Sequence, residues 1–137
     1  MAHYVLICGG RDLDGHEAQV AMHDVMEFLA LFYGVDLRIM HGGATGADTL
    51  AKDAATQFGV KSKAFPADWG RGKQAGPERN EKMGRLLVDW EQQGHSVEVI
   101  AFPGGRGSAH MARFAEQLGV NVTHIPVDGA PGSITST

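Results

Sequence analysis

The segment YVLICGGRD, residues 4–12, joins a run of apolar side chains to a pair of glycines. Such a run is typical of a strand buried on both faces, because a parallel strand covered by helices on each side has no solvated face. Gly9 and Gly10 follow at once, and glycine permits backbone turns that other residues avoid. The segment therefore predicts a central strand of a parallel sheet that ends in a glycine-rich loop.

Four more strand-like runs follow, and they alternate with helical segments. Residues 99–102 are nearly as apolar as residues 4–8, whereas Lys61 and Lys63 make another run more polar and place it nearer an edge of the sheet. The alternation predicts an α/β fold, a Rossmann-like three-layer domain with a mostly parallel sheet of about five strands and helices on both faces. The expected strands span residues 4–8, 37–41, 60–65, 97–102 and 120–125.

The first expected helix has an unusual apolar second half. It begins after Asp14, which has capping-box spacing to Glu17, and continues to about Tyr33. Either a second subunit, giving a homodimer or larger homo-oligomer, or an overlying loop or chain tail is expected to cover the extra apolar face. The expected core stripe is Ala18, Met22, Val25, Leu29 and Phe32, and the additional apolar residues are Met26, Phe28 and Leu31.

Three further helices are expected. One follows Gly46, one starts at Pro77, a residue suited to the first helical turn, and one runs from about Ser108 to Leu118. The length of 137 residues fits one domain, which we assign to residues 1–127, and residues 128–137 have the composition of a flexible tail.

Composition and charge limit the classes of function. Cys8 is the single cysteine, which excludes an intrachain disulfide, and we expect a buried strand residue in a reducing, cytoplasmic location. No membrane-spanning run is present, so no membrane partner is expected. The formal net charge of -4 disfavours nucleic acid as a partner. Residues 61–85 nevertheless carry an excess of basic side chains, which indicates a local anion site or a solvated helix face.

Glycine-rich loops follow three of the expected strands. In a parallel sheet these loops lie on one edge, where strand C-termini meet helix N-termini and where ligands of open α/β sheets bind. Glycines allow close backbone approach, and helix N-termini supply N–H donors, so the loops predict an anionic ligand site; structural tight turns are the alternative. The loop residues are Gly9, Gly10, Arg11 and Asp12; Gly42, Gly43, Ala44, Thr45 and Gly46; and Pro103, Gly104, Gly105, Arg106, Gly107 and Ser108.

Polar side chains near these loops have two interpretations each. Thr45 and Ser108 either contact a phosphate or act as helix N-caps, and Asp48 either accepts a ribose hydroxyl or complements a helix dipole. Arg79 continues the buried stripe of its helix and is assigned either a bidentate phosphate contact or a structural salt bridge. Asn80 and Glu81 are expected to flank the same ligand.

The long loop at residues 66–77 contains Trp69. Its indole either stacks on a base, with Arg71 and Lys73 neutralising phosphate, or anchors the loop onto the core. His41 and His110 lie beside two glycine loops, but no metal-binding spacing accompanies them. No metal and no required cofactor are therefore expected.

Four motifs in order resemble the SLOG superfamily, named for its Smf/DprA and LOG members, and specifically its small single-domain YspA/YpsA-like branch. The motifs are Gly9-Gly10-Arg11-Asp12, His41-Gly42-Gly43-Ala44-Thr45-Gly46-Ala47-Asp48, Gly76-Pro77-Glu78-Arg79-Asn80-Glu81-Lys82-Met83 and Pro103-Gly104-Gly105-Arg106-Gly107. The resemblance implies a Rossmann-like domain that binds nucleotides or nucleotide-derived ligands. LOG members hydrolyse the N-glycosidic bond of nucleoside monophosphates with glutamates that follow the last motif. Here His110 and Met111 stand at those positions, whereas Arg79 matches the helix arginine of the superfamily.

The leading hypothesis is a sensor or sequestering module that holds a nucleotide-type phosphate ligand in the glycine loops. The runner-up is a LOG-like nucleoside 5'-monophosphate phosphoribohydrolase, with Arg79, Glu81, His110 and Asp48 as catalytic candidates. A structural assembly protein is the third hypothesis. The ligand-binding candidates are Gly9, Gly10, Arg11, Gly42, Gly43, Ala44, Thr45, Gly46, Asp48, Trp69, Arg79, Asn80, Pro103, Gly104, Gly105, Arg106, Gly107 and Ser108.

Overall fold

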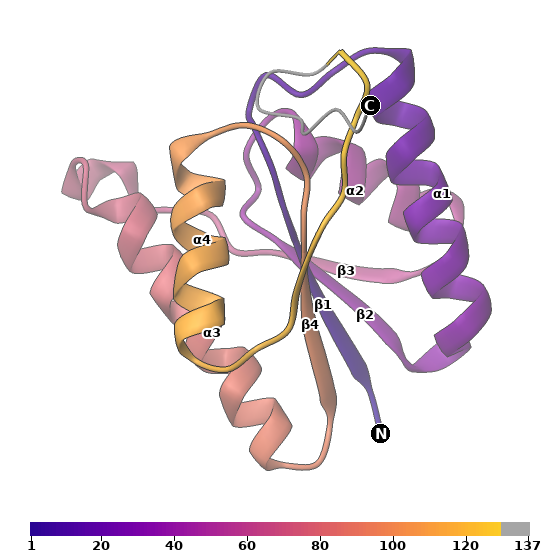
Figure 1. The fold of residues 1–137 in the computed structure, drawn as a ribbon. Helices are drawn as coiled ribbons and strands as arrows, with labels where there is room; N and C mark the ends of the chain where they lie inside the picture. The colour runs from indigo at the N-terminus through magenta and orange to yellow at the C-terminus, as the bar shows by residue number, and fades with distance from the viewer. Residues whose placement is uncertain (130–137) are drawn as a thin grey trace.

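The computed structural model describes residues 1–129 and shows a five-stranded parallel sheet between two helical layers (Figure 1). The strands lie in the order β3-β2-β1-β4-β5, so the two most apolar runs form neighbouring central strands and the lysine-containing run forms an edge. The elements are β1 (His3–Cys8), α1 (His16–Tyr33), β2 (Leu37–His41), α2 (Ala47–Gln57), β3 (Lys61–Ala64), α3 (Ala75–Gln92), β4 (Ser96–Ala101), α4 (Arg106–Gln117) and β5 (Val122–His124), with short 3-10 helices at Gly34–Asp36 and Trp69–Arg71.

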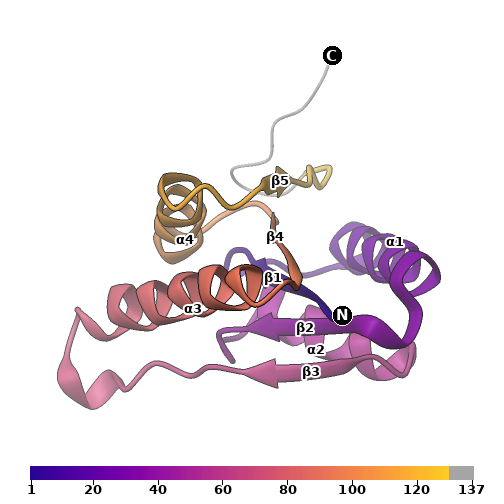
Figure 2. The ribbon, with the colours of Figure 1, turned by 90° about the horizontal axis from the view of Figure 1, so that it is seen from below.

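Two hydrophobic cores fill the space between the layers. One packs α1 and α2 against β1 and β2, and the other packs α3 and α4 against β1 and β4. Figure 2 shows the two helical layers, with α1 on one side of β1 and β4 and with α4 on the other. The fold is the α/β, Rossmann-like architecture that the alternating pattern predicts, with helices on both faces.

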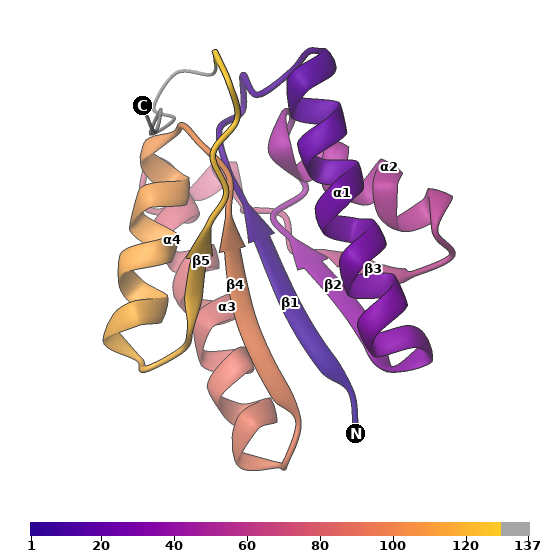
Figure 3. The same ribbon diagram turned by 45° about the vertical axis from the view of Figure 1, so that its right-hand side comes forward.

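The chain order reverses between β1 and β4. From β1 the chain moves outward through β2 to β3, then crosses back through α3 to β4 and continues to β5. Figure 3 shows β1 and β4 side by side, with the loops that follow them at the same end of the sheet. In open α/β sheets this reversal point is where ligands bind.

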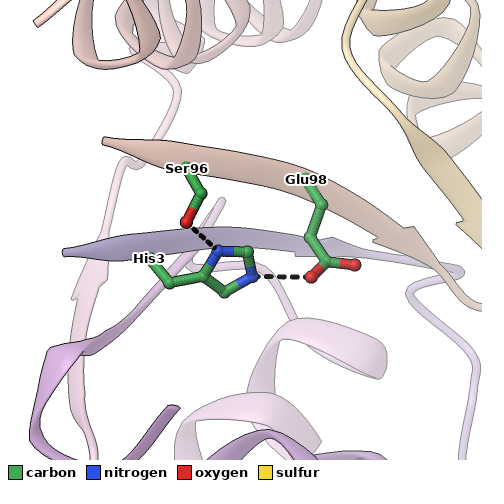
Figure 4. A network of polar contacts seen from close by, with 3 residues as sticks. All are labelled: His3, Ser96 and Glu98. Atoms are coloured by element: carbon green, nitrogen blue, oxygen red, sulfur yellow. Dashed lines mark hydrogen bonds and ion pairs between the residues drawn. The ribbon is translucent and has the colours of Figure 1, made fainter. Parts of the chain in front are cut away.

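A polar network links the two central strands at the opposite end of the sheet. The buried His3 ring contacts Ser96 Oγ through Nδ1 and Glu98 Oε2 through Nε2, each at 2.6 Å (Figure 4). Tyr33 at the end of α1 stacks on the same ring, with 3.7 Å between centroids. Partners on both sides of the ring keep a buried imidazole satisfied, and they fix the register of β1 against β4.

The helix starts differ from the sequence prediction. Asp14 does not cap α1: Gly15 is the N-cap, and no side-chain cap bond is made. Helix α3 begins at Ala75 rather than Pro77, which still lies in the first turn, where a missing N–H costs nothing. Helix α4 begins at Arg106 rather than Ser108, so Ser108 lies inside the helix and is not its cap.

The core stripe of α1 also differs from the prediction. Phe32 is 69% exposed, whereas Met26 is fully buried and takes its place in the core. An α-helix has 3.6 residues per turn, so a buried stripe through Met22, Met26 and Leu29 leaves position 32 to one side of the stripe. For the expected tail at residues 128–137, the structure places Asp128 and Gly129 in a turn, and residues 130–137 lie outside the described residues.

Candidate functional site

The glycine loops after β1, β2 and β4 contact one another through their backbones. The Gly10 N–H donates to the Pro103 carbonyl at 2.9 Å, and the Gly10 carbonyl accepts the Ala47 N–H at 3.0 Å. The loop after β1 therefore joins the loop after β4 on one side and the start of α2 on the other. The parallel topology places all three at one edge of the sheet.

Two glycines make this close packing possible. A Cβ on Gly9 would lie 2.6 Å from the Cβ of Ala47, and a Cβ on Gly46 would collide with the carbonyl oxygens of Gly10 and Arg11. Gly46 also has φ of 72°, which L side chains rarely adopt. Any larger side chain at either position would force the loops apart.

The loop between β2 and α2 is occupied by the protein's own polar groups. The Gly43 N–H donates to His41 Nδ1 at 3.1 Å, and the Ala44 N–H donates to Asp48 Oδ2 at 3.1 Å. Thr45 is not the N-cap of α2, because Gly46 holds that position and Thr45 Oγ1 donates to the Arg11 carbonyl at 3.2 Å. Two of the amides expected to face a ligand therefore bind side chains.

Burial controls the charge of these two side chains. Desolvation raises the pKa of Asp48, although the Ala44 N–H and the nearby His41 and Arg79 oppose that shift. Desolvation lowers the pKa of His41, against the attraction of Asp48. His41 is therefore neutral at pH 7, as its role as an acceptor for the Gly43 N–H requires.

Arg79 lies beside the glycine loops, where its guanidinium donates hydrogen bonds to backbone carbonyl groups. Its Nη1 donates to the Gly42 carbonyl at 2.7 Å and to the Phe65 carbonyl at 3.1 Å, which ties together the ends of β2 and β3. Desolvation lowers its pKa, Asp48 raises it, and the nearby positive charge of Arg11 lowers it again. These partners of Nη1 are backbone oxygens, and no carboxylate among residues 1–129 forms the ion pair that the salt-bridge interpretation requires.

Asn80 connects α3 to the first turns of α4. Arg79 Nε can only donate, so the Asn80 atom that it contacts at 3.0 Å is the acceptor Oδ1. The amide nitrogen of Asn80 then donates to the Gly107 carbonyl at 2.9 Å and faces His110 Nδ1 at 3.2 Å. His110 must accept at Nδ1, which assigns its proton to Nε2.

The N-terminus of α4 differs from that of α2 in charge and in hydrogen bonding. Helix α2 carries Asp48 in its first turn, but no acidic residue lies in the first turn of α4. Within residues 1–129, no acceptor binds the backbone N–H groups of Arg106, Gly107 and Ser108. A Cβ on Gly105 would lie 3.3 Å from the Cα of Gly10, so this turn adjoins the loop after β1.

Trp69 lies beside the same edge and is not anchored in the core. Its side chain is 53% exposed and belongs to neither core, which corrects the anchoring interpretation. The Arg11 guanidinium lies over the indole, 4.8 Å from the ring centroid. Arg71, which was expected to neutralise phosphate, forms an exposed ion pair with Glu78 at 3.1 Å.

The catalytic candidates do not form one hydrogen-bonded group. Glu81 pairs with Arg85 at 3.5 Å on α3, where it lines a surface hollow of about 470 Å³. Across the described part of the chain, no hydrogen bond or ion pair links Asp48, Glu81 and His110 with one another. In the same residues, no three His, Cys, Asp or Glu side chains gather where they could hold a metal ion.

Cys8 is a buried strand residue, as its position in an apolar run predicts. Its Sγ lies 4.0 Å from the Ser108 carbonyl, and burial raises the pKa of its thiol to about 12. The thiolate form is therefore negligible near neutral pH, which excludes a nucleophilic role for this side chain.

Comparison with known proteins identifies the family. The model of the YspA, cpYpsA-related SLOG family matches residues 3–72, which include the first two glycine loops. The chain belongs to this SLOG family. Gene 61 protein of Mycobacterium phage D29 is 37% identical to the SLOG chain over 94 residues, covering 63% of this chain and 69% of the phage protein.

Two solved structures resemble the SLOG chain in fold. The X-ray structure of TM1055, a structural genomics target, has a TM-score of 0.69 at 17% identity over 96% of this chain and 77% of its own. DNA processing protein A (DprA) from Streptococcus pneumoniae has a TM-score of 0.52 at 22% identity, over 89% of this chain and 58% of its own. Within residues 1–129, no helix has the length and apolar character needed to cross a bilayer.

Proposed function

We propose that this SLOG protein binds the phosphate of a nucleotide or nucleotide-derived ligand at the first turn of α4 and acts as a sensor or sequestering module. The observation that carries the proposal is the set of backbone N–H groups at residues 106–108, for which residues 1–129 supply no acceptor. Such groups, together with the positive end of the helix dipole, favour an anion.

The surroundings of α4 support an external anion there in preference to α2. Asp48 already complements the dipole of α2, and its carboxylate accepts a loop amide at that end. Arg106 opens α4, and Arg11 follows Gly10, which adjoins Gly105. Neither arginine has a carboxylate within ion-pair distance among residues 1–129, so both charges are available to a phosphate.

Gly107→Glu tests the phosphate site directly. The residue is exposed, its φ is not in the left-handed region, and a Cβ there would have open space, so the variant is expected to fold. Its carboxylate would complement the helix N-terminus and repel a phosphate. We expect AMP and ribose 5-phosphate to raise the melting temperature of the wild-type protein and to leave that of Gly107→Glu unchanged.

Gln117→Glu is the matched control, because it adds the same charge at the other end of α4. It is expected to respond to AMP as the wild-type protein does. If AMP and ribose 5-phosphate stabilise Gly107→Glu as much as they stabilise the wild type, the first turn of α4 is not the phosphate site.

A LOG-like phosphoribohydrolase is the second candidate function. The observation that favours it is His110, whose Nδ1 faces Asn80 and whose Nε2 therefore carries a proton near the first turn of α4. An imidazole N–H at this position can donate a hydrogen bond to the leaving base of a glycosidic cleavage. Chromatography of AMP after incubation distinguishes the two functions, because free adenine and ribose 5-phosphate appear only if the protein is a hydrolase.

We also infer that a second copy of the chain covers the exposed apolar face of α1. Phe28, Leu31, Phe32 and Val35 are 63%, 82%, 69% and 92% exposed. The spacing of the first three places them on one face of α1, and Val35 lies in the 3-10 helix that follows. Their exposed parts amount to about 600 Å² of surface, so a two-fold pairing would bury about 1,200 Å², the lower limit of a standard interface.

A further inference from the structure

Trp69 exposes a large aromatic surface that no structural role explains. Tryptophan normally contributes to a protein by burial of its ring, yet this indole is 53% exposed and lies in a 3-10 helix outside both cores. Trp90 shows the ordinary arrangement, because it stacks on Tyr4 with 3.8 Å between ring centroids and packs against a core.

The exposed ring is nevertheless held in place. A Cβ on Gly76 would lie 3.3 Å from the indole, so the ring packs closely against the backbone at the start of α3. The backbone of its 3-10 helix is closed by the bonds from Arg71 N–H to the Asp68 carbonyl at 2.9 Å and from Gly72 N–H to the Trp69 carbonyl at 3.1 Å. The ring is therefore held in place while about half of the residue remains exposed to solvent, as a stacking platform requires.

Arg11 connects this ring to the proposed phosphate turn. Its guanidinium lies over the indole, while Gly10, the residue before it, adjoins Gly105 at the start of α4. Arg11 also lies close enough to Arg79 for their positive charges to oppose each other, and a bound phosphate would relieve that repulsion. Arg11 thus follows a residue that adjoins the start of α4, and its own side chain lies over the aromatic surface.

We propose that Trp69 and Arg11 form a platform for the aromatic base of a nucleotide, so that the protein selects nucleotides over sugar phosphates. The inference rests on the proposed function, because the phosphate of the same ligand is held at α4. The base stacks on the indole, and the guanidinium stacks beside it or on the outer face of the base. The two-ring indole overlaps a purine better than a pyrimidine, so purine nucleotides bind more tightly.

Trp69→Ala and Trp69→Tyr test the platform by titration calorimetry with AMP, CMP and ribose 5-phosphate. Loss of one stacked base weakens binding by about tenfold or more, so we expect this loss for AMP with Trp69→Ala. Trp69→Tyr keeps a stacking ring and is expected to restore most of the affinity. Binding of ribose 5-phosphate is expected to be the same in all three proteins.

Fluorescence supplies a second readout. The chain has two tryptophans, so Trp90→Phe leaves Trp69 as the single emitter. We expect AMP to quench its emission and ribose 5-phosphate to leave it unchanged.

The outcomes separate the platform from the phosphate site. If ribose 5-phosphate binds the wild type as tightly as AMP, the platform is wrong and the phosphate site stands. If Trp69→Ala weakens both ligands equally, the ring only positions the loop, and base recognition is again wrong. If neither ligand binds the wild-type protein, the phosphate site and the platform are both overturned.

Discussion

His41 makes the stability of the protein depend on pH. Its folded pKa lies below the ordinary value of 6.5, mainly because the ring is buried at the end of β2. Below pH 6.5, His41 is therefore protonated more readily in the unfolded chain than in the folded chain. The contribution of His41 to stability is complete above that pH and is lost as the pH falls towards the folded pKa.

His41→Asn tests this dependence. The Asn Oδ1 keeps an acceptor for the Gly43 N–H but does not titrate. We expect urea denaturation to show a smaller loss of stability between pH 7 and pH 5 for the variant than for the wild type. Asp48 is present in both proteins, so its own titration largely cancels in the comparison. Equal losses in the two proteins would exclude His41 as the source.

Single residues show where sequence reasoning succeeds and where it stops. The glycine loops can be predicted from the sequence, because close loop packing leaves few alternatives to glycine at Gly9 and Gly46. The hydrogen-bond partners of Arg79 cannot be predicted from the sequence. The Gly42 carbonyl lies 37 positions away along the chain, and only the fold brings it close to Arg79. The same applies to Asp48, whose bond to the Ala44 N–H depends on the loop conformation and not on any motif.

At the scale of elements, the alternation of strand-like and helical segments locates every strand of the sheet, including the polar β3, but helix starts are less predictable. The residues that precede α1, α2 and α4 are Gly15, Gly46 and Gly105, and none makes a side-chain cap bond. The search for a polar capping residue therefore misplaces the starts of α1 and α4, whereas the expected start of α2 directly after Gly46 is correct. The start of α2 is set by the Gly10 carbonyl, which accepts the Ala47 N–H from another loop.

Gly46→Ala tests how strongly that contact constrains α2, with Gly59→Ala as the matched control. Both glycines have positive φ, at 72° and 67°, but a Cβ on Gly59 meets nothing within 4 Å. The control is expected to lose about 1–2 kcal/mol of unfolding free energy through backbone strain alone. Gly46→Ala is expected to lose a further ~1–3 kcal/mol from the collision with the loop after β1. Equal losses in urea denaturation would show that the loops separate freely.

For the whole molecule, the α1 face decides the state of assembly. Leu31→Glu puts a charge at the centre of the proposed interface, where burial without a partner is strongly unfavourable. We expect light scattering after gel filtration to give a dimer mass for the wild type and a monomer mass for this variant. Leu118→Glu, at an apolar residue 36% exposed beyond α4, is expected to remain dimeric. A monomeric wild-type protein would contradict the proposed pairing.

The pairing of β1 with β4 also affects how the chain folds during its synthesis. His3 aligns with Ser96, so β1 is synthesised long before β4, its second neighbour in the sheet, exists. Until then one border of β1, among the most apolar segments of the nascent chain, is open to any other extended peptide. β4 ends at Ala101, so the free edge of β1 can be covered only after synthesis has passed this residue.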